Sequence, residues 1–269
     1  MLKNIITDHR DILDGEYCLN VRFWQKNEDF NPENELCDTI CIFSDIENIM
    51  RAVSFKLPVV IYAKDKLEDY PVISHTYLVE SPGDITEEYL TKVYNRFYGI
   101  SNIVMSTERL IIREITISDL PALYEVYSDI TITQYMEGLY EDYREEEEFT
   151  KAYIENMYGF YDYGLWMVED KKTGNVIGRA GLSNRVIDDE NYIELGYVIS
   201  KPMQRKGYAY EASLAILDYA KNILKKEKVV ICTDKDNLPS IALAHKLGFD
   251  SVCNTVCDGH EYLIMVCML

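Results

Sequence analysis

The stretch Gln204-Arg205-Lys206-Gly207-Tyr208-Ala209 decides how the second half of the chain is interpreted. It lies between an apolar run, residues 195–199, and a helical pattern. A strand that leads through a short glycine-containing loop into a helix offers convergent backbone N–H groups and the positive end of the helix dipole. A side chain at Gly207 would keep a bulky phosphate away from that backbone, while Arg205 and Lys206 add positive charge. The stretch therefore predicts a site for a pyrophosphate.

Length and charge narrow the class of protein. The 269 residues, 48% of them hydrophobic, suffice for one large or two ordinary domains. A formal net charge of −19 argues against nucleic acid and anionic membranes as partners, and it favours cationic small molecules or basic peptides. No apolar run has membrane-spanning length, and charged residues between positions 8 and 14 break any signal-peptide pattern. Seven cysteines in no regular framework indicate reduced thiols. We therefore expect a cytoplasmic protein.

One cysteine cluster invites a metal interpretation. Cys253 and Cys257 are four residues apart, with His260 nearby. A zinc site made of these three side chains would lack a fourth ligand and the usual C-x2-C spacing. On a strand, the two cysteines would point to the same face, as small buried apolar residues do. We therefore predict no metal site.

The chain is predicted to divide within residues 99–107, giving domains 1–105 and 106–269. In the first domain, apolar runs at 39–43, 58–62 and 76–79 read as strands, and 45–55 and 86–98 as helices, which suggests a small parallel α/β layer. The segment 42–60 faintly resembles the last Asp-bearing unit of haloacid-dehalogenase-like phosphatases. No nucleophilic aspartate pair accompanies it, so Asp45 is predicted to cap a helix. We interpret this domain as non-catalytic: a substrate lid, a dimerisation element that would make the protein a homodimer, or a regulatory module.

The second domain reads as a mixed α/β unit with the element order β-α-α-β-β-β-α-β-α-β-β. The predicted strands are 109–115, 165–169, 176–182, 192–200, 229–233, 252–256 and 262–268. The predicted helices are 118–127, 142–158, 208–224 and 239–247. This order predicts a central sheet of about seven strands with four helices.

Residues 108–269 resemble a GNAT-superfamily N-acetyltransferase, most closely the ribosomal-protein N-alpha-acetyltransferase-like branch. The resemblance rests on motifs that occur in the family's order. They are Arg109 to Arg113, Gly178-x-x-Gly181-Leu182, Glu194 to Ile199, Gln204 to Ala209 with Tyr210-Glu211-Ala212, Asp236 to Ser240, and Lys246 to Phe249. The resemblance implies a sheet that splays between its fourth and fifth strands to admit the pantetheine arm of acetyl-coenzyme A.

The resemblance also implies which residues hold this co-substrate. Backbone groups of Val198, Ile199 and Ser200 would contact the pantetheine. The pyrophosphate would lie on the loop from Gln204 through Arg205, Lys206, Gly207 and Tyr208 to Ala209. Asn237 and Ser240 match a second cofactor contact, with an ordinary helix cap as the alternative for Asn237.

Catalysis requires an acceptor amine without its extra proton. Glu194 is the predicted general base, because many family members carry a glutamate there that acts through water. The alternative is a solvated strand residue, with the rate coming from holding amine and thioester together. A backbone N–H near Val198 would stabilise the developing oxyanion. Many family members protonate the leaving thiolate with a tyrosine where this chain has Ala244, so that role passes to another tyrosine or to none.

In the family that the chain resembles, the acceptor cleft lies between the first two helices and the last hairpin. Here that region carries Glu137, Glu141, Asp142 and Glu145 to Glu148, which favours a cationic primary amine on a small molecule or peptide. A glutamate run at a solvated helix start is the alternative. The aromatic residues nearby would line a pocket or form cation–π contacts; they are Tyr135, Tyr140, Tyr143, Tyr158, Phe160, Tyr161, Tyr163 and Trp166.

Three functions follow as hypotheses. The first is acetyl transfer from acetyl-coenzyme A to an amine by direct attack in a ternary complex. The second is a weak or inactive coenzyme A-binding module that regulates through its N-terminal domain. The third is a partner-binding role without a cofactor.

Overall fold

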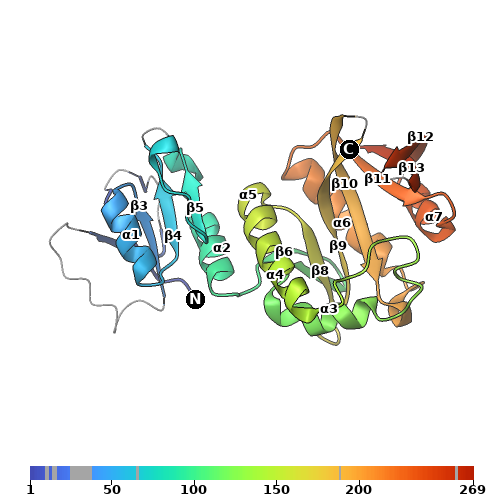
Figure 1. Cartoon of the computed structure of the whole chain (residues 1–269), viewed down its shortest axis with the longest axis horizontal. Coiled ribbons are helices and arrows are strands. Elements are labelled where there is room, and N and C mark those ends of the chain that lie inside the picture. The colour runs from blue at the N-terminus through green and yellow to red at the C-terminus, as the bar shows by residue number, and fades with distance from the viewer. Residues whose placement is uncertain (10–11, 14–16, 25–37, 65–66, 188, 258–259) are drawn as a thin grey trace. The chain divides into compact units, whose positions relative to one another are not determined.

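The computed structural model describes residues 1–9, 12–13, 17–24, 38–64, 67–187, 189–257 and 260–269. The chain forms two compact units, Met1–Asn102 and Ile103–Leu269 (Figure 1). The second unit begins at Ile103 rather than at the predicted residue 106. The reason is that β6 (Ile103–Ser106) pairs with the next strand of the second unit's sheet.

The first unit is a parallel sheet with the strand order β2-β1-β3-β4-β5. Its strands are β1 (Asn4–Thr7), β2 (Asn20–Phe23), β3 (Thr39–Phe43), β4 (Val59–Tyr62) and β5 (Thr76–Val79). Its helices are α1 (Ile46–Ser54) and α2 (Glu87–Phe97), with 3-10 turns at Leu67–Asp69 and Pro82–Asp84. Every residue of β3 is buried, as expected for a strand covered on both faces.

The two faces of this sheet hold separate cores. Ile40 and Ile42 of β3 pack into one cluster, and Cys41 and Phe43 into the other. This follows from the alternation of side chains along a strand. Strands β1 and β2 were not predicted, and β2 is exposed at all of its residues.

The second unit is a mixed sheet with the order β12-β13-β11-β10-β9-β8-β7-β6. The strands after β6 are β7 (Leu110–Arg113), β8 (Leu165–Asp170), β9 (Asn175–Ile187), β10 (Glu190–Ile199), β11 (Lys228–Asp234), β12 (Asp250–Cys257) and β13 (His260–Met268). All neighbours are antiparallel except β10 and β11. The described sheet has eight strands rather than about seven, because β6 adds one to those predicted.

The helices of this unit are α3 (Leu120–Tyr127), α4 (Tyr143–Tyr153), α5 (Gly159–Tyr161), α6 (Tyr208–Asn222) and α7 (Leu238–Lys246). Short 3-10 helices cover Ile117–Asp119 and Lys201–Met203. The single helix predicted over 142–158 instead passes from α4 into a π-helical turn, Ile154–Tyr158, and then α5. In α6, Ala212, Ile216 and Ala220 are buried in the main core.

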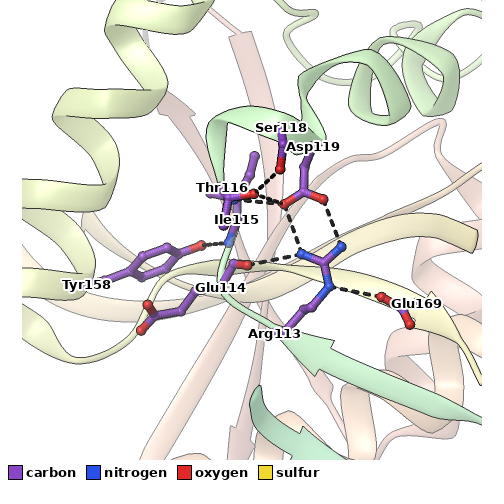
Figure 2. A network of polar contacts seen from close by, with 8 residues as sticks. All are labelled: Arg113, Glu114, Ile115, Thr116, Ser118, Asp119, Tyr158 and Glu169. Carbon is purple, nitrogen blue, oxygen red and sulfur yellow. Dashed lines mark hydrogen bonds and ion pairs between the residues drawn. The ribbon is translucent and has the colours of Figure 1, made fainter. Parts of the chain in front are cut away.

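A polar network fixes the start of α3 on the sheet (Figure 2). Arg113, the last residue of β7, bonds both oxygens of Asp119 at 2.8 and 2.9 Å and Glu169 at 3.0 Å. Asp119 also completes a capping box with Thr116. Burial raises the pKa of Asp119, but bonds from Arg113 and Thr116 outweigh it, so the net pKa is lowered. The carboxylate therefore stays charged and ties α3 to β7.

None of the helices in the described part of the chain combines the length and apolar character needed to span a bilayer.

Candidate functional site

The loop between β10 and α6 is open at the helix N-terminus. Gly207 precedes α6 with φ +85°, and Arg205 has φ +62°, both in the left-handed region. The N-cap residue Gly207 offers no side-chain cap, and the one acidic residue of the first turn, Glu211, is paired with Arg109. Arg205, Lys206 and Gly207 are exposed. The first-turn N–H groups and two cations therefore face solvent together, as an anion site requires.

Arg109, the residue before β7, holds this loop through contacts that were not predicted from the sequence. Arg109 Nη1 donates to the carbonyl of Lys206 at 3.0 Å, and its Nε bonds Glu211 at 2.6 Å. The Arg109 guanidinium also lies 4.5 Å from the ring centre of Tyr208. A Cβ at Gly207 would lie 3.4 Å from Arg109 Nη2, so the guanidinium packs closely on the glycine. The loop is thus fixed by an arginine about a hundred residues away in sequence.

Strands β10 and β11 separate soon after they meet. β10 pairs with β9 along Glu190–Ile199, whereas its parallel pairing with β11 has the single partner pair Glu194↔Val230. Beyond Glu194 the β11 side of β10 is therefore left without a strand partner, which is the splay that the resemblance implies.

Two hydrogen bonds show to which side of β10 each backbone N–H and C=O group points. The Ser200 N–H donates to the Ile177 carbonyl on the β9 side at 2.8 Å. Because peptide groups alternate along a strand, the N–H groups of Tyr197 and Ile199 face the splay. The Ile199 carbonyl fits this assignment, since it accepts from Gln204 Nε2 at 3.0 Å. Of the predicted backbone contacts, Ile199 faces the splay, whereas the N–H groups of Val198 and Ser200 face β9.

Glu194 lies where the splay begins. Its Oε2 is 4.0 Å from Arg185 Nε, and its side chain is only 17% exposed. Burial raises the pKa of Glu194 above its usual value, with Arg185 and hydrogen bonds from Cys232 partly offsetting this. Glu194 is therefore not a solvated strand residue, and a carboxylate of raised pKa is suited to accept a proton.

Across the splay, Tyr197 reaches the first turn of α7. Its hydroxyl lies 2.9 Å from Ser240 Oγ and 3.3 Å from the Ser240 carbonyl. Asn237 caps this helix, because its Oδ1 accepts from the Ser240 N–H at 3.3 Å. Ala244 is fully buried in the core. The contact between Tyr197 and Ser240 joins residues 43 apart in sequence and was not predicted.

The acidic segment before and within α4 has mostly structural contacts. Asp142 caps α4 through the Arg144 N–H at 2.7 Å. Glu146 is buried and accepts from the Tyr140 N–H at 3.0 Å, while Glu147 and Glu148 pair with Lys151. Three exposed carboxylates remain on the surface, at Glu137, Glu141 and Glu145.

The aromatic set divides between core and surface. Tyr158, Tyr163 and Trp166 are buried, whereas Tyr140, Tyr143, Phe160 and Tyr161 are exposed and Tyr135 is half-buried. The buried three therefore belong to packing, and the exposed ones are those able to meet a ligand.

The first unit has its own concave site, at the carboxyl ends of β1 and β3. Asp8, Asp45 and Lys64 are among its lining residues. Asp45 caps α1, as predicted, accepting from Glu47 and Asn48 N–H groups at 3.0 and 3.2 Å. Asp8 accepts from the N–H groups of Ser44 and Asp45. Carboxylates thus occupy the donors that an anionic ligand would need.

No group of three or more His, Cys, Asp or Glu side chains in the described part of the chain could hold a metal ion. The side chains of Cys257 and His260 lie outside that part. The predicted absence of a zinc site at Cys253, Cys257 and His260 therefore stays a prediction.

Comparison with known proteins places this site in a family. Residues 109–250 match the family described as "Acetyltransferase (GNAT) domain". The uncharacterized protein YkkB of Bacillus subtilis (strain 168) is 32% identical over 143 residues, which are 53% of this chain and 82% of that protein. The uncharacterized N-acetyltransferase YnaD of the same organism is 29% identical over 148 residues, covering 54% and 81%.

A solved structure has the same fold. It is a putative ribosomal-protein-serine acetyltransferase from Vibrio cholerae, 23% identical, with a TM-score of 0.52 over 61% of this chain and 96% of that one. At this identity the likeness concerns the fold alone. Since the family match covers more than half of the chain, including the loop, the splay and α7, the chain belongs to the GNAT family of acetyltransferases.

Proposed function

We propose that the chain transfers an acetyl group from acetyl-coenzyme A to a primary amine of a small molecule or peptide. Transfer is by direct attack of the amine on the thioester while both are bound. The observation that carries this proposal is the uncapped N-terminus of α6, held beside the splay between β10 and β11.

The donor site suits each part of a coenzyme A thioester. A pyrophosphate needs several N–H donors at close range, and the first turn of α6 with its left-handed loop supplies them without loss of side-chain entropy. Pantetheine amides need backbone partners, and the Ile199 N–H and the Tyr197 carbonyl face the splay. Bound acetyl-coenzyme A would supply an activated acyl group.

The chain's own residues would handle the proton of the amine and the charge on oxygen. Glu194, at the origin of the splay, accepts the proton directly or through one water. The Tyr197 N–H donates to the developing oxyanion, since it faces the splay and the Val198 N–H does not. Both groups lie on β10, a strand that is paired along its whole length with β9 and is therefore rigid.

A cationic acceptor is favoured by charge. The net charge of −19 attracts cations to the protein as a whole. Glu137, Glu141 and Glu145 offer exposed carboxylates before and within the first turn of α4. The other acidic residues of this segment are used by caps and ion pairs, so the proposed cation-attracting rim consists of these three.

Calorimetry and an acetyl-transfer screen on the full chain test the proposal. Acetyl-coenzyme A is titrated first. Release of free thiol is then followed with spermidine, an aminoglycoside and a peptide with a free N-terminus as acceptors. We expect saturable binding and transfer to at least one amine, with a matched acetylated acceptor giving no turnover.

The two other possible outcomes of these experiments would each support a different function. Binding without transfer to any amine of a broad panel would replace the proposal with a coenzyme A-binding regulatory module. Absence of binding would remove the donor assignment and favour a partner-binding role.

A further inference from the structure

The chain lacks an obvious donor for the proton that the departing sulfur needs. Protonation of the sulfur as it leaves lowers the charge that develops on it and speeds the step. Ala244 in α7 has no proton to give and is buried in the core. If a side chain of the enzyme donates this proton, it belongs to another element that faces the splay.

Tyr197 is placed for this role by its position on β10. It lies beyond Glu194, the point where β10 and β11 last pair, so its ring is beside the open part of the splay. Its hydroxyl reaches Ser240 at 2.9 Å, in the first turn of α7. The phenol therefore spans from one arm of the splay to the helix that follows the other arm.

The direction of the donor site would lead the pantetheine arm, and with it the sulfur, from the loop toward Tyr197. The pyrophosphate loop follows β10, and the splay begins at Glu194 near the middle of the strand. An extended pantetheine arm that runs from the loop along β10 therefore leads back toward Glu194. At about 3.3 Å per residue, the step from Ile199 to Tyr197 advances it by roughly 7 Å.

The surroundings keep the phenol protonated. Burial raises the pKa of Tyr197 above its usual value, and the hydrogen bond with Ser240 only partly offsets this. A phenol that holds its proton at neutral pH has that proton available when negative charge builds up on the sulfur as the C–S bond breaks.

We propose that Tyr197 is the general acid of this enzyme and contacts the sulfur of coenzyme A through its hydroxyl. The inference rests on the proposed function. As the C–S bond breaks, its electron pair stays on sulfur and the Tyr197 proton moves to it. Ser240 orients the hydroxyl and stabilises the phenolate by a hydrogen bond. The phenolate regains a proton from solvent, which has received the one lost by the amine, so no co-reactant is needed.

A binding measurement isolates the contact with sulfur. Calorimetry on the full chain compares coenzyme A with desulfo-coenzyme A, which lacks the thiol, for wild type and Tyr197→Phe. We expect wild type to favour coenzyme A and the variant to reduce this preference by about 2- to 10-fold, the range for one hydrogen bond. Tyr192→Phe is the matched control. Its hydroxyl lies on the same strand but bonds Glu190 at 2.8 Å, before the splay.

Turnover supplies the second readout. With the amine that gives the highest transfer rate among spermidine, an aminoglycoside and a free peptide N-terminus, Tyr197→Phe should lower kcat by about 100-fold or more. Its KM for acetyl-coenzyme A should stay within about 3-fold of wild type. With the selenoester analogue of acetyl-coenzyme A, whose leaving group needs no proton, the loss should shrink to a few-fold.

The outcomes are distinct. The inference would be overturned if Tyr197→Phe kept the wild-type preference for coenzyme A over the desulfo analogue. It would also be overturned if the variant lost the same factor in kcat with the thioester as with the selenoester. Either result would leave the proposal of acetyl transfer intact. Failure of wild type to bind acetyl-coenzyme A would instead remove the proposed function and this inference together. Circular dichroism of both phenylalanine variants separates either result from misfolding.

Discussion

The chain contains two strand-to-helix junctions that look alike in outline but present opposite charges. At the end of β3, Asp45 caps α1, and Asp8 takes the N–H groups of Ser44 and Asp45. At the end of β10, Gly207 leaves α6 without any side-chain cap. A helix N-terminus is thus open to an anion where no carboxylate of the chain accepts from its first N–H groups; Glu211 in the first turn of α6 accepts from Arg109 instead. The difference assigns anion binding to the second unit.

The strongest test of the difference between the two junctions is to place a carboxylate at the N-terminus of α6. Gly207→Glu places a carboxylate over the first turn of α6 and strains a backbone at φ +85°. We expect the affinity for acetyl-coenzyme A to fall by about 100-fold or more, which is at least about 2.7 kcal/mol. Calorimetry measures it.

The control for that change is Gly174→Glu. Gly174 also has positive φ but lies in the β8–β9 turn with open space around it. It should carry the same backbone strain and leave affinity unchanged. Equal losses in both variants would show that strain, not occupancy of the junction, is the cause.

The two junctions also differ in the strand that leads to them. β3 carries no ionisable carboxylate, whereas β10 carries Glu194 at the splay. Glu194→Gln should lower kcat by about 100- to 10,000-fold. The wild-type rate should rise with pH through the pKa of Glu194, which burial raises, because a base must be deprotonated to act. The variant should lose this rise.

A pH–rate profile between mildly acidic and neutral conditions measures this effect. Glu190→Gln, on the same strand but exposed, should keep both the rate and the profile. A profile that is unchanged in Glu194→Gln would exclude this residue as the base.

Removing the carboxylate that caps α1, at the junction after β3, should have the smallest effect of these changes on stability and binding. Asp45→Ala removes the cap of α1 and should lower the stability of the first unit by about 1 kcal/mol. The affinity for acetyl-coenzyme A should not change. Each unit contains one of the two tryptophans, Trp24 in the first and Trp166 in the second. In a Trp166→Phe background, the fluorescence of Trp24 during denaturation therefore reports on the unfolding of the first unit. A loss of affinity in Asp45→Ala would show that the cap also supports the donor site.

Patterns local in sequence predicted most of the second unit. The glycine loop at 204–209 lies within a single segment, so its chemistry can be inferred directly from the sequence. Strand β6 was assigned to a linker because it follows one helical pattern and comes just before the next predicted strand. The π-helical turn at Ile154–Tyr158 was missed because it keeps the apolar spacing of an ordinary helix.

Contacts between distant segments could not be predicted. The contacts of Arg109 with Lys206 and Glu211, and the reach of Tyr197 to Ser240, depend on how strands are placed in the sheet. The peptide directions along β10 depend on its register with β9, which is why Tyr197 and Ile199, rather than Val198, supply the N–H groups facing the splay.

The single pairing of Glu194 with Val230 has a consequence for the lifetime of the protein. Under the proposed function, acetyl-coenzyme A bonds to the backbone groups of β10 that have no strand partner. The co-substrate would therefore stabilise the folded second unit in addition to taking part in the reaction. A ligand at a hundred times its Kd adds about 2.7 kcal/mol to folding stability. Proteases act on opened forms, so the abundance of this enzyme in a cell would follow the supply of its thioester.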